Sequence, residues 1–62
     1  MRDSQRVEDS LRDSDVWMSL KLISQRTEIP TGRVYLALME LVRDKKVKQR
    51  QASRGSQFRI IP

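Results

Sequence analysis

Hydrophobic residues in the second half of the chain follow two different periods. A helix over about 32–45 is predicted by apolar residues at helical spacing, namely Val34, Ala37, Leu38, Leu41 and Val42. Beyond it, 47–52 and 57–61 have strand character, with side chains alternating between two faces. The four residues Ser53–Ser56 contain a central glycine, which is typical of a turn. We therefore expect a hairpin over about 47–61 that buries Phe58 and Ile60 and turns Lys48 and Arg50 outward.

The middle of the chain predicts a shorter helix that ends at a proline. Ser19 is a good N-cap, and Leu20, Ile23 and Thr27 share one face of a helix over about 20–28. Pro30 stops this helix, because the residue before a proline avoids the α region. Thr31 is then expected to cap the next helix with its hydroxyl.

The N-terminal part carries fewer apolar residues. Val7 and Leu11 form a thin stripe on a helix over about 4–12, which Asp3 or Ser4 would cap. A break follows, and residues 16–18 are expected to form a short strand. This segment holds the only tryptophan, Trp17, which we expect to pack between the sheet and the helices.

Composition narrows the functional classes. The 62 residues include no cysteine and no histidine, which excludes disulfides and the usual zinc sites and removes the commonest nucleophile and base. We therefore expect neither an enzyme nor a protein with a metal, a cofactor or a small-molecule substrate. No apolar run approaches the roughly 20 residues that span a bilayer. The expected location is cytoplasmic (nucleoid-associated), or nuclear in a eukaryote.

The charge is distributed unevenly along the chain. The net charge is +5, yet residues 1–15 hold three arginines against five acidic residues. The remaining residues hold ten basic side chains against three acidic ones. This asymmetry favours a polyanionic partner, although basic loops on a solvated surface would give the same composition.

Ser24, Ile29 and Val34 follow one another at steps of five residues. This is the internal spacing of a helix-turn-helix, in which a small residue allows the two helices to cross and an apolar residue anchors the turn. With a short strand before this unit and a hairpin after it, residues 16–61 resemble the winged-helix superfamily of transcription regulators. The chain is similar in size to the small fimbrial-operon (FaeA-like) members.

The resemblance implies a fold and a binding face. The fold would be α+β, a single winged helix-turn-helix domain over residues 1–62, with three helices and a small antiparallel sheet made of the short strand and the C-terminal hairpin. Residues Thr31–Lys45 would form the recognition helix in the major groove, and Ala52–Ser56 the tip of a wing on the backbone or minor groove. Many members carry glycine at the position held here by Glu28.

The residues expected to contact DNA come from these two elements. They are Thr31, Gly32, Arg33, Tyr35, Leu36, Arg43, Lys48, Arg50, Arg54 and Arg59. Arg33 would reach a guanine, although a plain surface arginine explains it equally well. Leu36 and Met39 would either widen the core or form an exposed apolar patch.

Two functions from different classes follow. The first is a sequence-specific DNA-binding protein, a transcription regulator that reaches useful specificity through a homodimer or a partner protein. The alternative is a winged helix that binds another protein through Tyr35, Leu36 and Met39. Binding of RNA or of single-stranded nucleic acid is a third hypothesis. Its support is thin, because the expected recognition helix offers only one exposed aromatic side chain for stacking.

Overall fold

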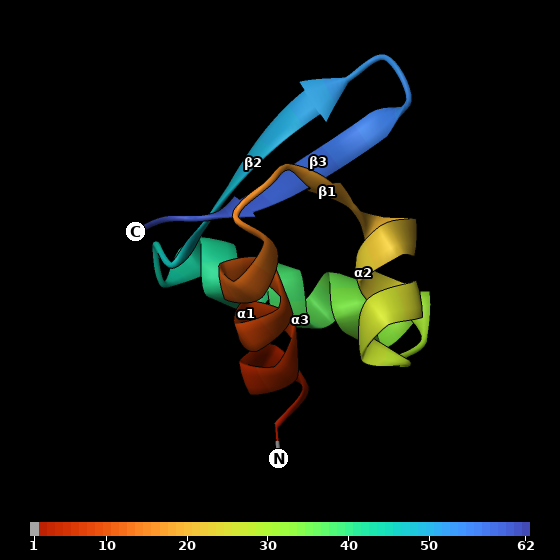
Figure 1. Ribbon diagram of the computed structural model, residues 1–62, viewed down its shortest axis with the longest axis vertical. Helices are drawn as coiled ribbons and strands as arrows, with labels where there is room; N and C mark the ends of the chain where they lie inside the picture. The colour runs from red at the N-terminus through yellow and green to blue at the C-terminus, as the bar shows by residue number, and fades with distance from the viewer. Residues whose placement is uncertain (1) are drawn as a thin grey trace.

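The computed structural model describes residues 2–62 and contains three helices and a three-stranded antiparallel sheet (Figure 1). The α+β class expected from the sequence is therefore confirmed. In chain order the elements are α1 (Asp3–Ser14), β1 (Met18–Ser19), α2 (Leu20–Thr27), α3 (Thr31–Arg43), β2 (Val47–Ala52) and β3 (Gly55–Ile60). Helix α1 extends two residues beyond the expected end at 12, because the chain reverses only at Asp15, whose φ is 45°.

The last strand of the chain lies in the centre of the sheet. The strand order is β1-β3-β2, and β3 pairs antiparallel with both neighbours. Met18 lies opposite Phe58, and Val47 lies opposite Ile60. Since β1 has only two residues, the β2–β3 hairpin continues past it, and its tip projects beyond the helices (Figure 1).

One face of the sheet and the inner sides of the helices share a single core. Twelve apolar residues are buried in it: Val7, Leu11, Met18, Ile23, Ile29, Val34, Ala37, Leu38, Leu41, Val47, Phe58 and Ile60. Fully burying a side chain such as Phe58 or Leu38 contributes about 1.5–3 kcal/mol each, so this cluster supplies the main stabilisation of a small fold. Met39 packs against its margin, whereas Leu36 is 68% exposed, so only the former widens the core.

The turn between α2 and α3 is fixed by backbone and side-chain bonds. The Ser19 hydroxyl accepts the amide of Leu22 at 3.2 Å, as expected for an N-cap. Helix α2 ends at Glu28, which has a left-handed backbone (φ 60°, ψ 29°) and donates its amide to Ser24 at 2.9 Å. The Ser24 hydroxyl donates to the carbonyl of Ile29, the buried residue of the turn. The bonds made by Ser24, Glu28 and Ile29 set the direction in which α3 begins.

The expectation that Thr31 caps α3 with its hydroxyl is wrong. Pro30 occupies the N-cap position, and Thr31 is the first helical residue and makes no side-chain cap. The carbonyl of Pro30 accepts the amides of Arg33 and Val34, both at 3.0 Å. Proline has no amide to satisfy and a fixed φ, so it can start the helix one residue earlier than a threonine cap would.

The expected short strand is present but lies later than 16–18, and the expected packing of Trp17 between the sheet and the helices is wrong. Strand β1 is Met18–Ser19, Val16 is 52% exposed, and Met18 rather than Trp17 is in the core. Neighbouring strand residues point to opposite faces, so the pairing of Met18 with Phe58 leaves Trp17 on the outer side of the sheet. Within residues 2–62, no helix is both long and apolar enough to cross a membrane.

Candidate nucleic-acid interface

A groove runs between the tip of the hairpin and the beginnings of α2 and α3. It has a volume of about 970 Å³ and is lined by Ser19, Leu20, Lys21, Thr31, Ala52, Arg54, Gly55, Ser56, Gln57 and Phe58. The two charged residues of this lining, Lys21 and Arg54, are both basic. An unopposed pair of cations at the edges of a groove raises the local concentration of polyanions.

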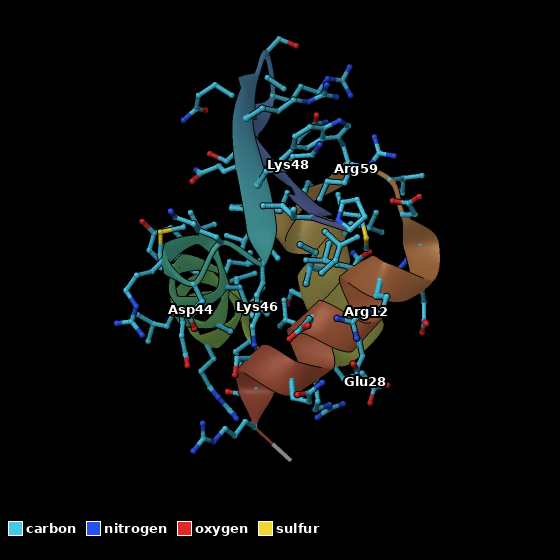
Figure 2. All side chains as sticks on the ribbon, turned by 90° about the vertical axis from the view of Figure 1, so that its left-hand side faces the viewer. Arg12, Glu28, Asp44, Lys46, Lys48 and Arg59 are labelled. Atoms are coloured by element: carbon cyan, nitrogen blue, oxygen red, sulfur yellow. The ribbon has the colours of Figure 1, made fainter. Side chains whose placement is uncertain are left out.

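The hairpin presents different chemistry on its two faces. On the face that also carries buried Val47 and Phe58, the amide of Gln49 donates to the Ser56 hydroxyl at 3.2 Å. The Ser56 hydroxyl donates in turn to Gln51 at 3.4 Å. The opposite face carries Lys48, Arg50 and Arg59, with Lys48 directly across from Arg59 in the register. Figure 2 shows these last two side chains close together on the sheet.

Trp17 lies under two of these cations. The guanidinium carbon of Arg50 is 4.2 Å from the ring centroid, and the Lys48 ammonium nitrogen is 5.7 Å away. Arg50 also donates its Nε–H to the Gln57 side chain at 2.8 Å. A cation held over an indole ring gains about 0.5–1 kcal/mol at an exposed site, so the stack orders Arg50 without neutralising it.

The acidic residues of α1 and its C-cap pair with Arg12, Lys46 and one hairpin cation, Arg59. Glu8, which is buried, contacts Arg12 and lies 3.9 Å from the Lys46 nitrogen. Asp15 approaches Arg59 at 3.4 Å. Figure 2 places Arg12 and Lys46 on the helical side of the molecule, away from Lys48.

Apart from Arg59, the cations on the groove and on the hairpin have no such partners in the described part of the chain. Of Lys21, Lys48, Arg50 and Arg54, none lies within 4.0 Å of a carboxylate in the described part of the chain. The strands themselves contain no acidic residue. The hairpin and the start of α2 thus carry four cations that no carboxylate of the described chain neutralises.

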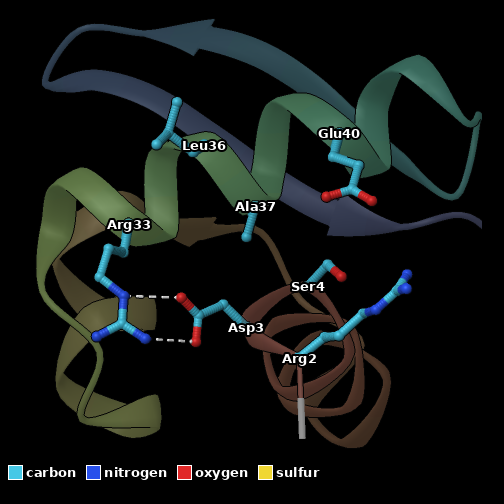
Figure 3. Close-up of a pocket in the computed structure, with 7 residues that line it drawn as sticks. All are labelled: Arg2, Asp3, Ser4, Arg33, Leu36, Ala37 and Glu40. Atoms are coloured by element: carbon cyan, nitrogen blue, oxygen red, sulfur yellow. Dashed lines mark hydrogen bonds and ion pairs between the residues drawn. The ribbon is translucent and has the colours of Figure 1, made fainter.

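Arg33 faces α1 across a second cavity (Figure 3). This cavity has a volume of about 600 Å³ and is lined by Arg2, Asp3, Ser4, Arg33, Leu36, Ala37 and Glu40. The Arg33 guanidinium donates two parallel hydrogen bonds to Asp3, from Nε to Oδ2 and from Nη2 to Oδ1, both at 2.8 Å. Asp3 opens α1 and Arg33 lies in the first turn of α3, so the pair joins the beginnings of two helices.

The outer side of α3 carries the other expected contacts. Gly32 is exposed, and a Cβ at this position would meet no atom within 4 Å. Tyr35 is 48% exposed and stands beside the more exposed Leu36. Arg43, at the end of the helix, is 3.6 Å from Asp44.

The ten expected contact residues thus fall into three places. Thr31 and Arg54 line the groove. Gly32, Arg33, Tyr35, Leu36 and Arg43 follow the exposed side of α3. Lys48, Arg50 and Arg59 lie on the face of the hairpin that the helices do not cover.

Sequence reasoning missed two members of these surfaces. Lys21 reaches the groove from the first turn of α2, and Trp17, the residue before β1, orders Arg50. Helical periodicity places Lys21 on the exposed side of its helix, but only the tertiary arrangement shows that this side faces the hairpin tip. Within residues 2–62, no cluster of acidic side chains could hold a metal ion.

Comparison with known proteins does not assign the chain to a family. The chain matches no protein-family model, and neither the curated proteins nor the solved structures contain a significant match.

Proposed function

We propose that this protein binds double-stranded DNA as a transcription regulator of the winged helix-turn-helix type. In this proposal α2 and α3 form the helix-turn-helix, and the β2–β3 hairpin is the wing. The exposed side of α3 enters the major groove, and the wing contacts the flanking backbone or the minor groove. The expected contacts are those predicted from the sequence, with Lys21 added.

One observation carries the proposal: the groove between the wing and the helix starts is bordered by Lys21 and Arg54, and its lining contains no acidic residue. Phosphate contacts supply most of the sequence-independent affinity for DNA, and lysine and arginine make most of these contacts. The uneven ion pairing supports the same conclusion. Asp3 and Glu8 are paired with cations outside the wing, whereas Asp15 approaches one wing cation, Arg59, at 3.4 Å.

Features of α3 and the wing also suit a nucleic acid. Exposed Gly32 in the first turn of α3 permits close approach of a sugar–phosphate backbone. The amide and hydroxyl groups of Gln49, Gln51 and Ser56 add hydrogen-bond donors beside the groove.

The experiment compares two double variants in the binding of a fluorescent mixed-sequence duplex at increasing salt. K21Q/R54Q removes the two cations of the groove, and R2Q/K45Q removes two exposed cations outside it. Each neutralised phosphate contributes about 0.9 to the slope of log affinity against log salt, so the groove variant should lose about two units of slope. The control should keep the wild-type slope.

The salt series also contains the results that would overturn the proposal. Wild-type affinity that does not change between low and high salt would exclude a phosphate-based interface. Equal slopes in the two double variants would show that the groove is not the site. Circular dichroism of each variant verifies that it is folded.

The protein-interaction alternative is favoured by one observation, the 68% exposure of Leu36 beside half-exposed Tyr35. Met39 packs against the core, which leaves this surface with two large side chains rather than three. Under this alternative L36S, which adds no charge, should weaken binding of a partner protein, while the salt slope for DNA stays unchanged.

A further inference from the structure

The ion pair between Asp3 and Arg33 uses only one edge of the guanidinium group. An arginine side chain offers five N–H donors, arranged so that two pairs can each meet a planar acceptor. Asp3 occupies the side edge, formed by Nε and Nη2, with both bonds at 2.8 Å. The third nitrogen, Nη1, points away from Asp3 in Figure 3 and makes no hydrogen bond within residues 2–62.

The remaining donors form a second fork at the end of the side chain. This fork consists of one hydrogen of Nη1 and the second hydrogen of Nη2. This end edge has the geometry that pairs with the N7 and O6 acceptors of guanine in the major groove. The Arg33 side chain is 61% exposed, so a base can reach that edge without displacing Asp3.

Asp3 itself is held by a well-packed element. It opens α1, whose Val7 and Leu11 side chains are fully buried in the core. Its carboxylate is 28% exposed, less than half the exposure of the arginine that it binds. Arg33, by contrast, is a cation at the start of a helix, where the helix dipole does not favour it. The position is therefore poorly suited to an arginine whose only role is to stabilise the helix.

We propose that Asp3 is a positioning residue that fixes Arg33 for the recognition of one guanine. The inference rests on the proposed binding of α3 in the major groove. Two hydrogen bonds to the side edge hold the long side chain in one conformation, so DNA meets a preordered fork instead of a mobile one. Asp3 does not touch DNA, yet base selectivity depends on it.

The test begins with selection of duplexes from a randomised library by the wild-type protein. The selected duplex is then compared with one in which the guanine preferred at a single position is replaced by adenine. A bidentate arginine–guanine contact should give an affinity ratio of about 5- to 150-fold between them. R33A should bring this ratio close to one.

D3N is the decisive variant, and D13N is its matched control. Asp13 is an exposed residue of the same helix and makes no ion pair in the described structure, so both changes raise the net charge equally. An asparagine at position 3 is neutral and has one acceptor oxygen instead of two, so it cannot form the two parallel bonds to Nε and Nη2. D3N should therefore lower the guanine ratio by about 2- to 12-fold, the range for immobilising one flexible side chain, while D13N keeps it. D3E should restore part of the ratio because it retains the carboxylate.

Further measurements distinguish failure of the proposed role of Asp3 from failure of the proposed DNA binding. The Nε–H resonance of Arg33 should be protected from exchange in the wild type and in D13N, and lose that protection in D3N, which reports the contact without DNA. An unchanged guanine ratio in D3N, or a ratio that rises above that of D13N, would overturn the role of Asp3. Loss of the ratio in R33A with retained salt-dependent binding leaves the proposed function intact. Absence of any duplex binding by the wild type overturns both proposals.

Discussion

Arg12 and Lys46 on the helical side and Lys48 and Arg50 on the hairpin are similar cations in opposite electrostatic situations. On the helical side Arg12 and Lys46 share the buried carboxylate of Glu8. On the hairpin side Lys48 and Arg50 lie over an indole ring and have no carboxylate nearby in the described chain. The same residue type thus stabilises the fold in one region and remains available to a ligand in the other, so a count of charges cannot locate the interface.

The largest effect that this contrast predicts is a loss of stability in the variant R12Q/K46Q. Removing both cations leaves the carboxylate of Glu8 buried without a charged partner, which should lower the free energy of unfolding by about 2–3 kcal/mol. Urea denaturation followed by far-UV circular dichroism measures the loss. The affinity for a duplex, measured in conditions where the variant is folded, should stay near that of the wild type.

The variant K48Q/R50Q should show the reverse pattern. Its affinity for the same duplex should fall by roughly tenfold near 0.1 M salt, as expected for the loss of about two phosphate contacts. The loss of the stack on Trp17 should lower the free energy of unfolding by only about 0.5–1 kcal/mol. Fluorescence anisotropy and urea denaturation together measure the pair of effects. If both double variants lost affinity equally, the distinction between the two regions would be wrong.

The turn between α2 and α3 predicts a smaller effect of opposite sign. Glu28 has a left-handed backbone, which is unfavourable for a residue with a side chain and easily adopted by glycine. The substitution Glu28→Gly should raise the free energy of unfolding by about 0.5–1 kcal/mol, after allowance for the greater freedom of glycine in the unfolded chain. Thermal unfolding measures it, with E40G in the middle of α3 as a control that should be destabilised. A destabilised E28G would show that the glutamate side chain contributes more than its backbone costs.

Local patterns in the sequence were sufficient to predict the helices and the hairpin, but not which segments pack against each other. Apolar residues at helical spacing placed α3, and alternation with a central glycine placed the hairpin, because both depend on neighbours within a few residues. Trp17 shows the limit. Either Trp17 or Met18 could face the core, and the choice is fixed by the register with Phe58, forty positions away.

The candidate interface shows the same limit. Charge asymmetry indicated the C-terminal part of the chain, yet the sequence does not show that Asp3 binds Arg33 or that Glu8 is buried. These contacts join residues thirty or more positions apart, and they depend on how α1 packs against α3 and on the position of Lys46. The position of Lys21 in the interface could not be predicted for a similar reason, because the hairpin tip that it faces comes from residues far along the chain.

The central position of β3 sets the order in which the chain can fold. The sheet has no pairing at all without residues 55–60, because β1 and β2 each bond only to β3. The helices form from local contacts, whereas closing β1 onto β3 requires a long loop to be ordered first. The β2–β3 hairpin also pairs residues close in sequence, so we expect the helices and the hairpin to form early in refolding and β1 to join β3 late.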